Sequence, residues 1–171
     1  MKKLTLFLLV ASALGAKAQT RNFQIAAGYG TSTVGAGIAI QGNLGFVVAA
    51  QIGIGYIPGT SSVPGTAGLE GGLKFYFSRA NVTSAFSPYA EIEFGTLGES
   101  ANVETFYPYG FQLTNNATTL SGPSVLFGTE IYLPGDRFGF NLALGYSYNT
   151  VPDPANTKGL FAFDLGLTVG L

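Results

Sequence analysis

Apolar residues recur at every second position through most of the chain, in eight segments separated by turn-forming residues. Successive side chains of a β-strand point to opposite faces, so this period of two predicts strands with one apolar face. We expect the strands at residues 22–30, 33–41, 46–57, 68–78, 88–98, 124–133, 137–149 and 160–171.

The two faces of these segments differ in chemistry. One face is aromatic and aliphatic, as in Val34, Ala36, Ile38 and Ile40 of the second segment or Phe138, Phe140, Leu142 and Leu144 of the seventh. The other face is glycine-rich and polar, and it holds the charged residues. A soluble barrel would turn this glycine-rich face to water, leaving backbone exposed on a poorly soluble surface. We therefore expect the apolar face to meet lipid and the polar face to line a narrow lumen.

Composition supports this interpretation. Only 10% of the residues are charged, although the chain contains 25 glycines, 14 phenylalanines and 9 tyrosines. Ordinary soluble domains contain about 25% charged residues. Outside the N-terminus there is no apolar run of the length that a transmembrane helix needs. The sequence thus predicts an all-β fold, a closed antiparallel transmembrane barrel of about eight strands in an up-and-down meander.

Short and long connections alternate along the chain. Short turns are expected at 42–45, 79–87 and 134–136, and longer loops at 30–33, 57–67, 98–123 and 150–159. Membrane barrels have short periplasmic turns and longer outer loops. Tyrosines should then mark the outer interface and phenylalanines the inner one; these are Tyr29, Tyr56, Tyr146 and Tyr148, and Phe46, Phe77 and Phe138.

The N-terminus has the features of an export signal. A basic start at Lys2 and Lys3 precedes an apolar stretch from Leu4 to Ala13, and Ala16-Lys17-Ala18 fits a cleavage site. We expect a signal peptide at 1–18 and a single barrel domain at 19–171. The mature part has five basic and nine acidic residues, a net charge of −4. It has no basic patch, which argues against nucleic-acid binding.

Three motifs resemble the small outer-membrane β-barrel family of the OmpA/OmpX type. They are Pro88-Tyr89-x5-Gly95, Gly128-x-Glu130-x-Tyr132, and the C-terminal Asp164-x-Gly166-x-x-Val169-x-Leu171. The last is similar to the signal by which the barrel-assembly machinery recognises its clients, although Leu171 stands where an aromatic residue is usual. Asp164, Gly166, Val169 and Leu171 are therefore a candidate assembly signal. The resemblance implies an integral protein of the outer membrane of a Gram-negative, diderm bacterium, in contact with membrane lipid.

The candidate internal site is a group of charged residues on the lumen face. Glu70, Glu91, Glu93, Glu130 and Asp164 accompany a single base, Lys74. Pairing of neighbouring strands should bring Lys74, Glu91, Glu93 and Glu130 together as a lumen charge cluster. Either this is a structural polar core with water, or it holds a proton or a cation. No catalytic residue, cofactor site or metal site is predicted, because the chain has no histidine and nothing else selects a base.

Two functions fit this sequence. The first is a non-enzymatic structural or surface-interaction role through the outer loops, where Phe106, Tyr107, Tyr109 and Phe111 form a candidate interaction loop for a protein partner. The alternative is a narrow, porin-like channel or small-ligand carrier. A permanent pore is disfavoured, because eight strands leave an interior only wide enough for side chains or one small ligand. A soluble ligand-binding barrel is a distant third.

Overall fold

The computed structural model describes residues 22–45, 47–59, 65–77, 86–104, 114–133, 137–152 and 156–171, with backbone only at 101–104 and 114–116. It contains eight strands: β1 (Phe23–Gly30), β2 (Gly35–Asn43), β3 (Val48–Ile57), β4 (Thr66–Tyr76), β5 (Phe86–Glu104), β6 (Thr114–Tyr132), β7 (Phe138–Tyr148) and β8 (Gly159–Gly170). Within the described ranges, no helix is long and apolar enough to cross a membrane.

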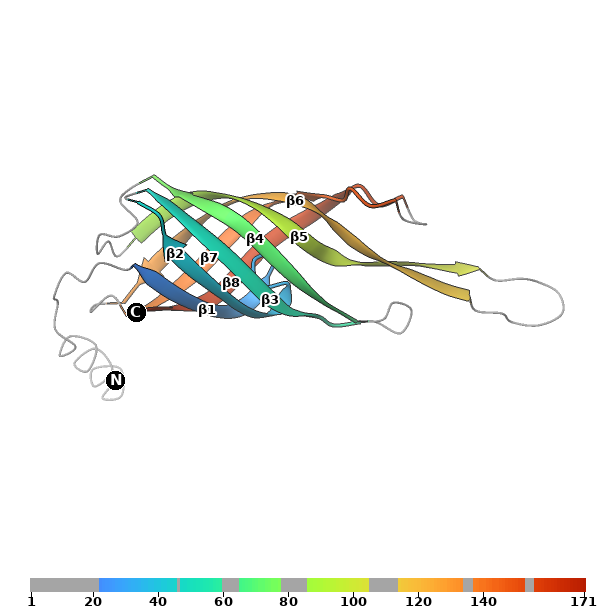
Figure 1. Cartoon of the computed structure of the whole chain (residues 1–171), viewed down its shortest axis with the longest axis horizontal. Coiled ribbons are helices and arrows are strands. Elements are labelled where there is room, and N and C mark those ends of the chain that lie inside the picture. The colour runs from blue at the N-terminus through green and yellow to red at the C-terminus, as the bar shows by residue number, and fades with distance from the viewer. Residues whose placement is uncertain are drawn as a thin grey trace, which may run out of the picture.

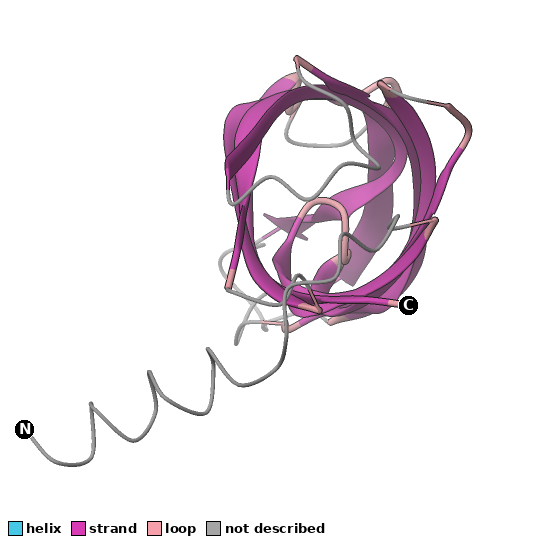
Figure 2. Cartoon of the chain, turned by 90° about the vertical axis from the view of Figure 1, so that its left-hand side faces the viewer, coloured by secondary structure: helices cyan, strands magenta, loops and turns pink. Residues whose placement is uncertain are grey.

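The strands form one closed barrel in which each pairs antiparallel with the next in sequence. Pairing of β1 with β8, from Gln24 opposite Gly170 to Gly30 opposite Asp164, closes the ring. Figure 1 shows the tilted strands from the side, and Figure 2 shows the closed ring. We call the end that holds Phe23 and Gly170 the terminal end and the end that holds Gly30 and Gly159 the distal end. The predicted fold class is confirmed.

The barrel is apolar outside and polar inside. Large apolar side chains such as Phe127, Leu142 and Leu165 are exposed around the barrel, whereas the charged residues Glu91 and Lys74 are buried. This inverts the arrangement of a soluble protein and matches a barrel surrounded by lipid. The predicted tyrosines lie outward near the distal end, and Phe77 and Phe138 lie outward near the terminal end. Phe46 lies outside the described residues.

The predicted outward orientation is wrong for one residue. Val34 was expected on the apolar outer face, but it is only 1% exposed. The second strand begins at Gly35, and Val34 has a positive φ of 49°. Because this left-handed conformation is uncommon for a β-branched residue, it marks a turn rather than a strand. The backbone NH of Val34 donates to the Thr31 carbonyl over 3.0 Å, and the turn points Ser32, Thr33 and Val34 into the barrel.

The predicted bounds of the loop at 98–123 are also wrong. β5 and β6 are each 19 residues long and continue their pairing to Glu104 and Thr114, leaving only 105–113 between them. The outer pairing of β5 with β4 stops at Gly95, and that of β6 with β7 stops at Ser124. The remainder is a two-stranded hairpin that projects past the barrel (Figure 1). The strands of this hairpin were not predicted, because polar residues such as Thr118 and Asn116 interrupt the apolar alternation on which the prediction relied.

The other predicted strand ends lie within two residues of the observed ones. The strand ends that flank the predicted turns at 42–45, 79–87 and 134–136 lie at the terminal end, and those that flank the longer connections lie at the distal end. β2 continues to Asn43, and residues 78–85 and 134–136 lie outside the described residues. Leu133 was placed in the sixth strand but follows its last residue, Tyr132.

Candidate functional site

The lumen is filled by side chains. A cavity of about 20 Å³ lies in the described part of the lumen, bounded by residues that include Gln51, Lys74, Asn141 and Asp164. A site needs roughly 10–15 Å³ to hold one water molecule. The described part of the lumen is therefore a packed polar core with room for about one water or ion, in agreement with the small radius of an eight-stranded barrel.

Glu130 on β6 is the centre of a hydrogen-bonded network in the terminal half of the lumen. Its Oε1 accepts from Lys74 Nζ at 3.0 Å and from the Tyr76 hydroxyl at 2.8 Å. Its Oε2 lies 2.5 Å from the Tyr132 hydroxyl. The Tyr76 oxygen in turn accepts from Gln41 Nε2 at 2.7 Å. Both oxygens of this buried carboxylate thus have charged or phenolic donors, the condition under which a buried charge is stable.

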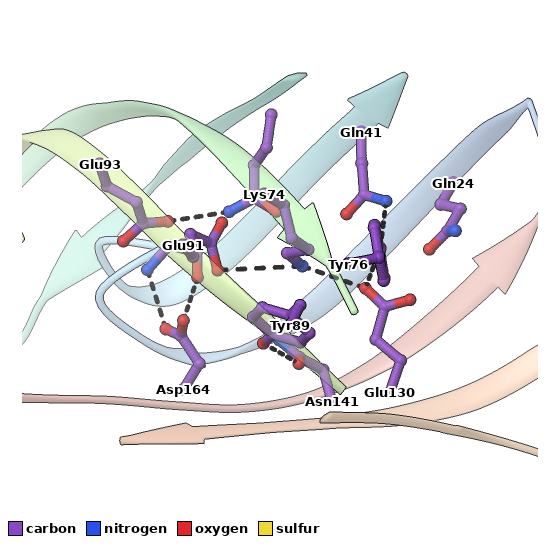
Figure 3. Close-up of polar contacts among 12 residues, drawn as sticks. Gln24, Gln41, Lys74, Tyr76, Tyr89, Glu91, Glu93, Glu130, Asn141 and Asp164 are labelled. Atoms are coloured by element: carbon purple, nitrogen blue, oxygen red, sulfur yellow. Dashed lines mark hydrogen bonds and ion pairs between the residues drawn. The ribbon is translucent and has the colours of Figure 1, made fainter. Parts of the chain in front are cut away.

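Lys74 on β4 is the only buried basic residue in the described part of the chain. Besides its bond to Glu130, its Nζ lies 3.9 Å from Glu91 Oε2 and 4.3 Å from the centre of the Tyr89 ring. The Tyr89 hydroxyl donates to Asn141 Oδ1 at 2.5 Å, which fixes the ring (Figure 3). The 3.0 Å bond to Glu130 and the cation–π contact with Tyr89 direct the Lys74 ammonium group toward the terminal half of the lumen.

The distal half of the lumen holds four carboxyl groups, the acidic cluster: Glu70, Glu91, Glu93 and Asp164. One oxygen from each of Glu91, Glu93 and Asp164 lies within 4.8 Å of the others. Glu93 Oε1 accepts from Gln51 Nε2 at 2.9 Å, but both oxygens of Glu70, both of Glu91 and Oε2 of Glu93 have no hydrogen-bond partner among the described residues. The cluster is therefore poorly compensated, in contrast to Glu130.

Glycines on neighbouring strands make room for these acids. A Cβ at Gly95 would meet Glu70 Oε2, and one at Gly30 would meet Asp164 Oδ1. A Cβ at Gly72 would meet Glu93 Cγ. Three of the four acids thus lie over a glycine of the adjacent strand, where a larger residue would displace the acidic side chain. The glycine-rich face predicted from the sequence is the complement of the acids that share it.

Asp164 also holds the connection between β1 and β2 inside the distal mouth. Its Oδ1 accepts from the Ser32 backbone NH at 2.8 Å, and its Oδ2 accepts from the Ser32 hydroxyl (Figure 3). A Cβ at Gly53 would meet the Ser32 carbonyl oxygen, and one at Gly55 would meet the Thr33 carbonyl oxygen. Glycines of β3 thus let the connection, which we call the plug turn (Thr31–Val34), pack against the barrel wall.

The four residues predicted as the lumen charge cluster are together. Lys74 lies directly opposite Glu91, close to the register expected, and it contacts Glu130. Of the candidate assembly signal, Asp164 faces the lumen, Gly166 lies opposite Gly28, and Val169 pairs with Ile25. Leu171 follows β8 and is exposed. The candidate interaction residues Phe106, Tyr107, Tyr109 and Phe111 lie outside the described residues, between β5 and β6.

Sequence reasoning missed the three buried tyrosines of the lumen. Tyr76 and Tyr132 bind Glu130, and Tyr89 lies beneath Lys74. Each stands two positions from a charged lumen residue, so the period of two already placed them inside. This signal was missed because aromatic residues were assigned to the outer face on the basis of residue type alone. A tyrosine can fill a lumen and also supply a hydrogen-bond donor.

Comparison with known proteins gives one structural likeness. The fold is similar to that in the crystal structure of the N-terminal β-barrel domain of Pseudomonas aeruginosa OprF, with a TM-score of 0.60 and 15% sequence identity, over 90% of this chain and 100% of that chain. The sequence matches no family model and no curated protein. At this identity the likeness concerns the fold alone, a closed antiparallel barrel of eight strands.

Proposed function

We propose that the chain is a non-catalytic integral protein of the outer membrane of a diderm bacterium, and that its barrel presents the β5–β6 hairpin to a partner outside the membrane. The observation that carries this proposal is the hairpin itself. Residues 98–104 and 114–120, the hairpin arm, pair only with each other among the described strands. Seven strand residues extend about 20 Å, so the arm reaches well beyond the barrel rim.

The arm offers chemistry suited to a protein partner. Both of its outer edges have backbone groups that pair with no other described strand, and such edges can add a strand from another chain. A register shift between Thr96 and Gly98 marks a β-bulge where the arm leaves the barrel. Bulges bend a strand and increase its twist, so this one sets the direction of the arm. The aromatic residues proposed for interaction connect its two strands in sequence.

Membrane insertion can be tested on the outer face. Leu142 lies near the middle of β7 and is exposed. An arginine at the bilayer midplane of a barrel costs about 2–4 kcal/mol, so Leu142→Arg should lower the unfolding free energy by that amount in lipid vesicles. Thr119→Arg, on an exposed position of the arm, is the matched control and should be nearly neutral. Equal stability of the two variants would contradict insertion of the barrel.

The chain has no cysteine, so single-cysteine variants report exposure cleanly. Thr119→Cys should react with a membrane-impermeant maleimide on intact cells. Leu44→Cys, on an exposed position of the turn after β2 at the terminal end, should react only after the outer membrane is permeabilised. Reaction of both variants in intact cells, or of neither, would contradict the proposed orientation.

The role of the arm can be tested by removing it. In a variant with residues 98–120 replaced by a two-residue turn, the barrel should still refold, because its other contacts are retained. Proteins that co-purify with the full chain from native membranes should be lost from this variant. An unchanged set of co-purifying proteins would assign any interaction to another part of the barrel.

The second candidate function, a narrow channel or small-ligand carrier, has less support. The interior cavity of about 20 Å³ is too small for a conducting path. A hollow of about 150 Å³ at the distal rim, bounded in part by Tyr29, Val34 and Phe163, is smaller than the roughly 300–1,000 Å³ of typical ligand sites. A second hollow, of about 460 Å³, reaches that size, but its lining residues come from Tyr148 and the connection that follows β7 and not from the lumen. We expect no single-channel conductance in planar bilayers, and steady unitary currents would favour the channel instead.

A further inference from the structure

The acidic cluster has more negative charge than its surroundings can balance. Glu70, Glu91, Glu93 and Asp164 are all buried in the same half of the lumen, and each comes from an inward position of β4, β5 or β8. Lys74 is the buried base of the described lumen, and it lies closer to Glu130 than to Glu91. Buried carboxylates require a partner, a proton or a metal ion. Four such groups around one already engaged ammonium therefore call for a further positive charge.

Glu70 is the observation that distinguishes this cluster from a chance group of acids. It is 2% exposed, and neither of its carboxylate oxygens has a hydrogen-bond partner among the described residues. Its register places it diagonal to Glu93 on the same face, since Gly72 lies opposite Glu93 and Gly95 lies opposite Glu70. Its Oε2 lies against Gly95 of β5. Glu91, which is fully buried, also has no hydrogen-bond partner for either oxygen in the described part of the chain, and it lies within the group that it forms with Glu93 and Asp164. Two unpartnered buried carboxylates thus share this half of the lumen.

The cluster contains only oxygen ligands of the kind that hard cations prefer. Glu91, Glu93 and Asp164 already bring three carboxylate oxygens within 4.8 Å of one another. Ca²⁺ takes six to eight oxygens, from carboxylates, amide carbonyls and water, in a flexible geometry. The Gln51 amide, which contacts Glu93, lies beside the cluster, and the interior cavity borders it. No nitrogen or sulfur ligand that would favour zinc or copper is present, because the chain has neither histidine nor cysteine.

We propose that Glu70, Glu91, Glu93 and Asp164 bind a hard divalent cation, of the Ca²⁺ class, inside the distal half of the barrel. The plug turn covers this region through the two bonds from Ser32 to Asp164. The cation therefore enters during folding or after displacement of the plug turn. Once bound, it neutralises the repulsion among the acids and stabilises the closed barrel.

The competing source of positive charge is the proton. Glu91, Glu93 and Asp164 bring carboxylate oxygens within 4.8 Å of one another, so a proton held among them would also relieve their repulsion. Protonation and cation binding predict different dependences of barrel stability on the solution conditions. A shared proton stabilises the barrel only as the pH falls. A bound Ca²⁺ stabilises it at neutral pH and in proportion to its concentration.

The test uses the whole mature chain refolded into lipid vesicles at neutral pH, with Ca²⁺ as the probe and NaCl of matched ionic strength as the reference. Ca²⁺ present during refolding should raise the urea midpoint of unfolding. Tb³⁺, as a Ca²⁺ substitute, should show luminescence sensitised by tyrosine, because Tyr89 lies beside Lys74 next to Glu91 and the chain has no tryptophan. A midpoint that is the same in Ca²⁺ and NaCl would overturn the proposal.

Variants separate the site from general effects of the ion on the membrane. Glu70→Gln and Glu93→Gln should each weaken the Ca²⁺ affinity at least tenfold. They should also fold without Ca²⁺ at least as well as the parent, since a neutral amide relieves repulsion. Glu99→Gln removes one carboxylate from the hairpin arm and should keep the parent response. Overturning results are a parent-like Ca²⁺ response in Glu70→Gln and Glu93→Gln, or a stability that varies with pH and not with Ca²⁺, the signature of protons alone.

This experiment is independent of the role proposed for the hairpin arm. It reads the stability of the barrel and the luminescence of the lumen, and the arm contributes no residue to the acidic cluster. A barrel without the arm should keep the Ca²⁺ response. Failure of the cation site therefore leaves the interaction role intact, and failure of the interaction role leaves the cation site intact.

Discussion

The two halves of the barrel lumen use the same acidic side chains with opposite results. In the terminal half, Glu130 accepts hydrogen bonds from Lys74 and from two tyrosine hydroxyls. In the distal half, Glu70 and Glu91 receive no hydrogen bond from the described residues. The carboxyl groups of both halves are buried to a similar degree, so burial alone does not separate them. What separates them is the supply of donors: tyrosines and a lysine line one half, and glycines line the other.

This difference assigns the two halves different tasks. A fully bonded buried network rigidifies a core and specifies one packing. A buried group without partners lowers stability, and its presence in a natural sequence points to a strain that something else relieves. We therefore regard the terminal half as the structural core of the barrel and the distal half as the region that responds to a bound charge.

The largest effect is expected at the residue that links the halves. Lys74→Met leaves Glu130 and Glu91 without their cation, and removal of one partner of a buried pair costs about 3–5 kcal/mol. The loss should be smaller at about pH 5 than at about pH 8, because protonation within the acidic cluster around Glu91 reduces the negative charge that Lys74 balances. Unfolding titrations in lipid vesicles at the two pH values measure both effects. A loss that does not vary with pH would show that Lys74 acts by packing alone.

The register of strands explains why Lys74 could be placed from the sequence. Its partner across the sheet, Glu91, follows from alternation plus one turn, and both are local properties of the chain. The facing of almost every strand follows from the same alternation. Contacts across the lumen do not, since they depend on the closure and tilt of the whole barrel. The bonds from Gln51 to Glu93 and from Ser32 to Asp164 are of this kind.

Two errors share one physical cause. Val34 and the hairpin arm were both misassigned where a segment leaves the wall of the barrel, because there the lipid no longer selects one face. The plug turn buries polar Ser32 and Thr33 inside, and the arm has polar residues at successive positions such as Thr118 and Thr119. Neither has the apolar alternation from which strands were predicted. The sequence pattern is thus informative where the membrane imposes it and uninformative beyond the rim.

A pair of isosteric substitutions should give effects of opposite sign. Glu130→Gln places an amide where three donors converge, so we expect a loss of about 1–3 kcal/mol. Glu70→Gln removes a buried charge without donors, so we expect a gain of about 1 kcal/mol in buffer without divalent cations. Both are measured as changes in the unfolding free energy at neutral pH. If the two variants shift stability in the same direction, the contrast between the halves is wrong.

The smallest effect concerns the border between the acidic cluster and the plug turn. Ser32→Ala removes the hydroxyl that donates to Asp164 and leaves the backbone NH bond of 2.8 Å in place. We expect a loss of about 0.5–1.5 kcal/mol, the net contribution of one hydrogen bond. The matched control is Ser87→Ala, because the Ser87 hydroxyl is also buried but has no hydrogen-bond partner among the described residues. Its removal deletes an unsatisfied group, so that variant should be neutral or slightly more stable. Because both substitutions delete the same atom from a buried site, their difference isolates the bond to Asp164. If Ser32→Ala proved as stable as Ser87→Ala, the hydroxyl would contribute nothing, and backbone NH groups would hold the plug turn, that of Ser32 bonded to Asp164 and that of Thr31 bonded to the Phe163 carbonyl.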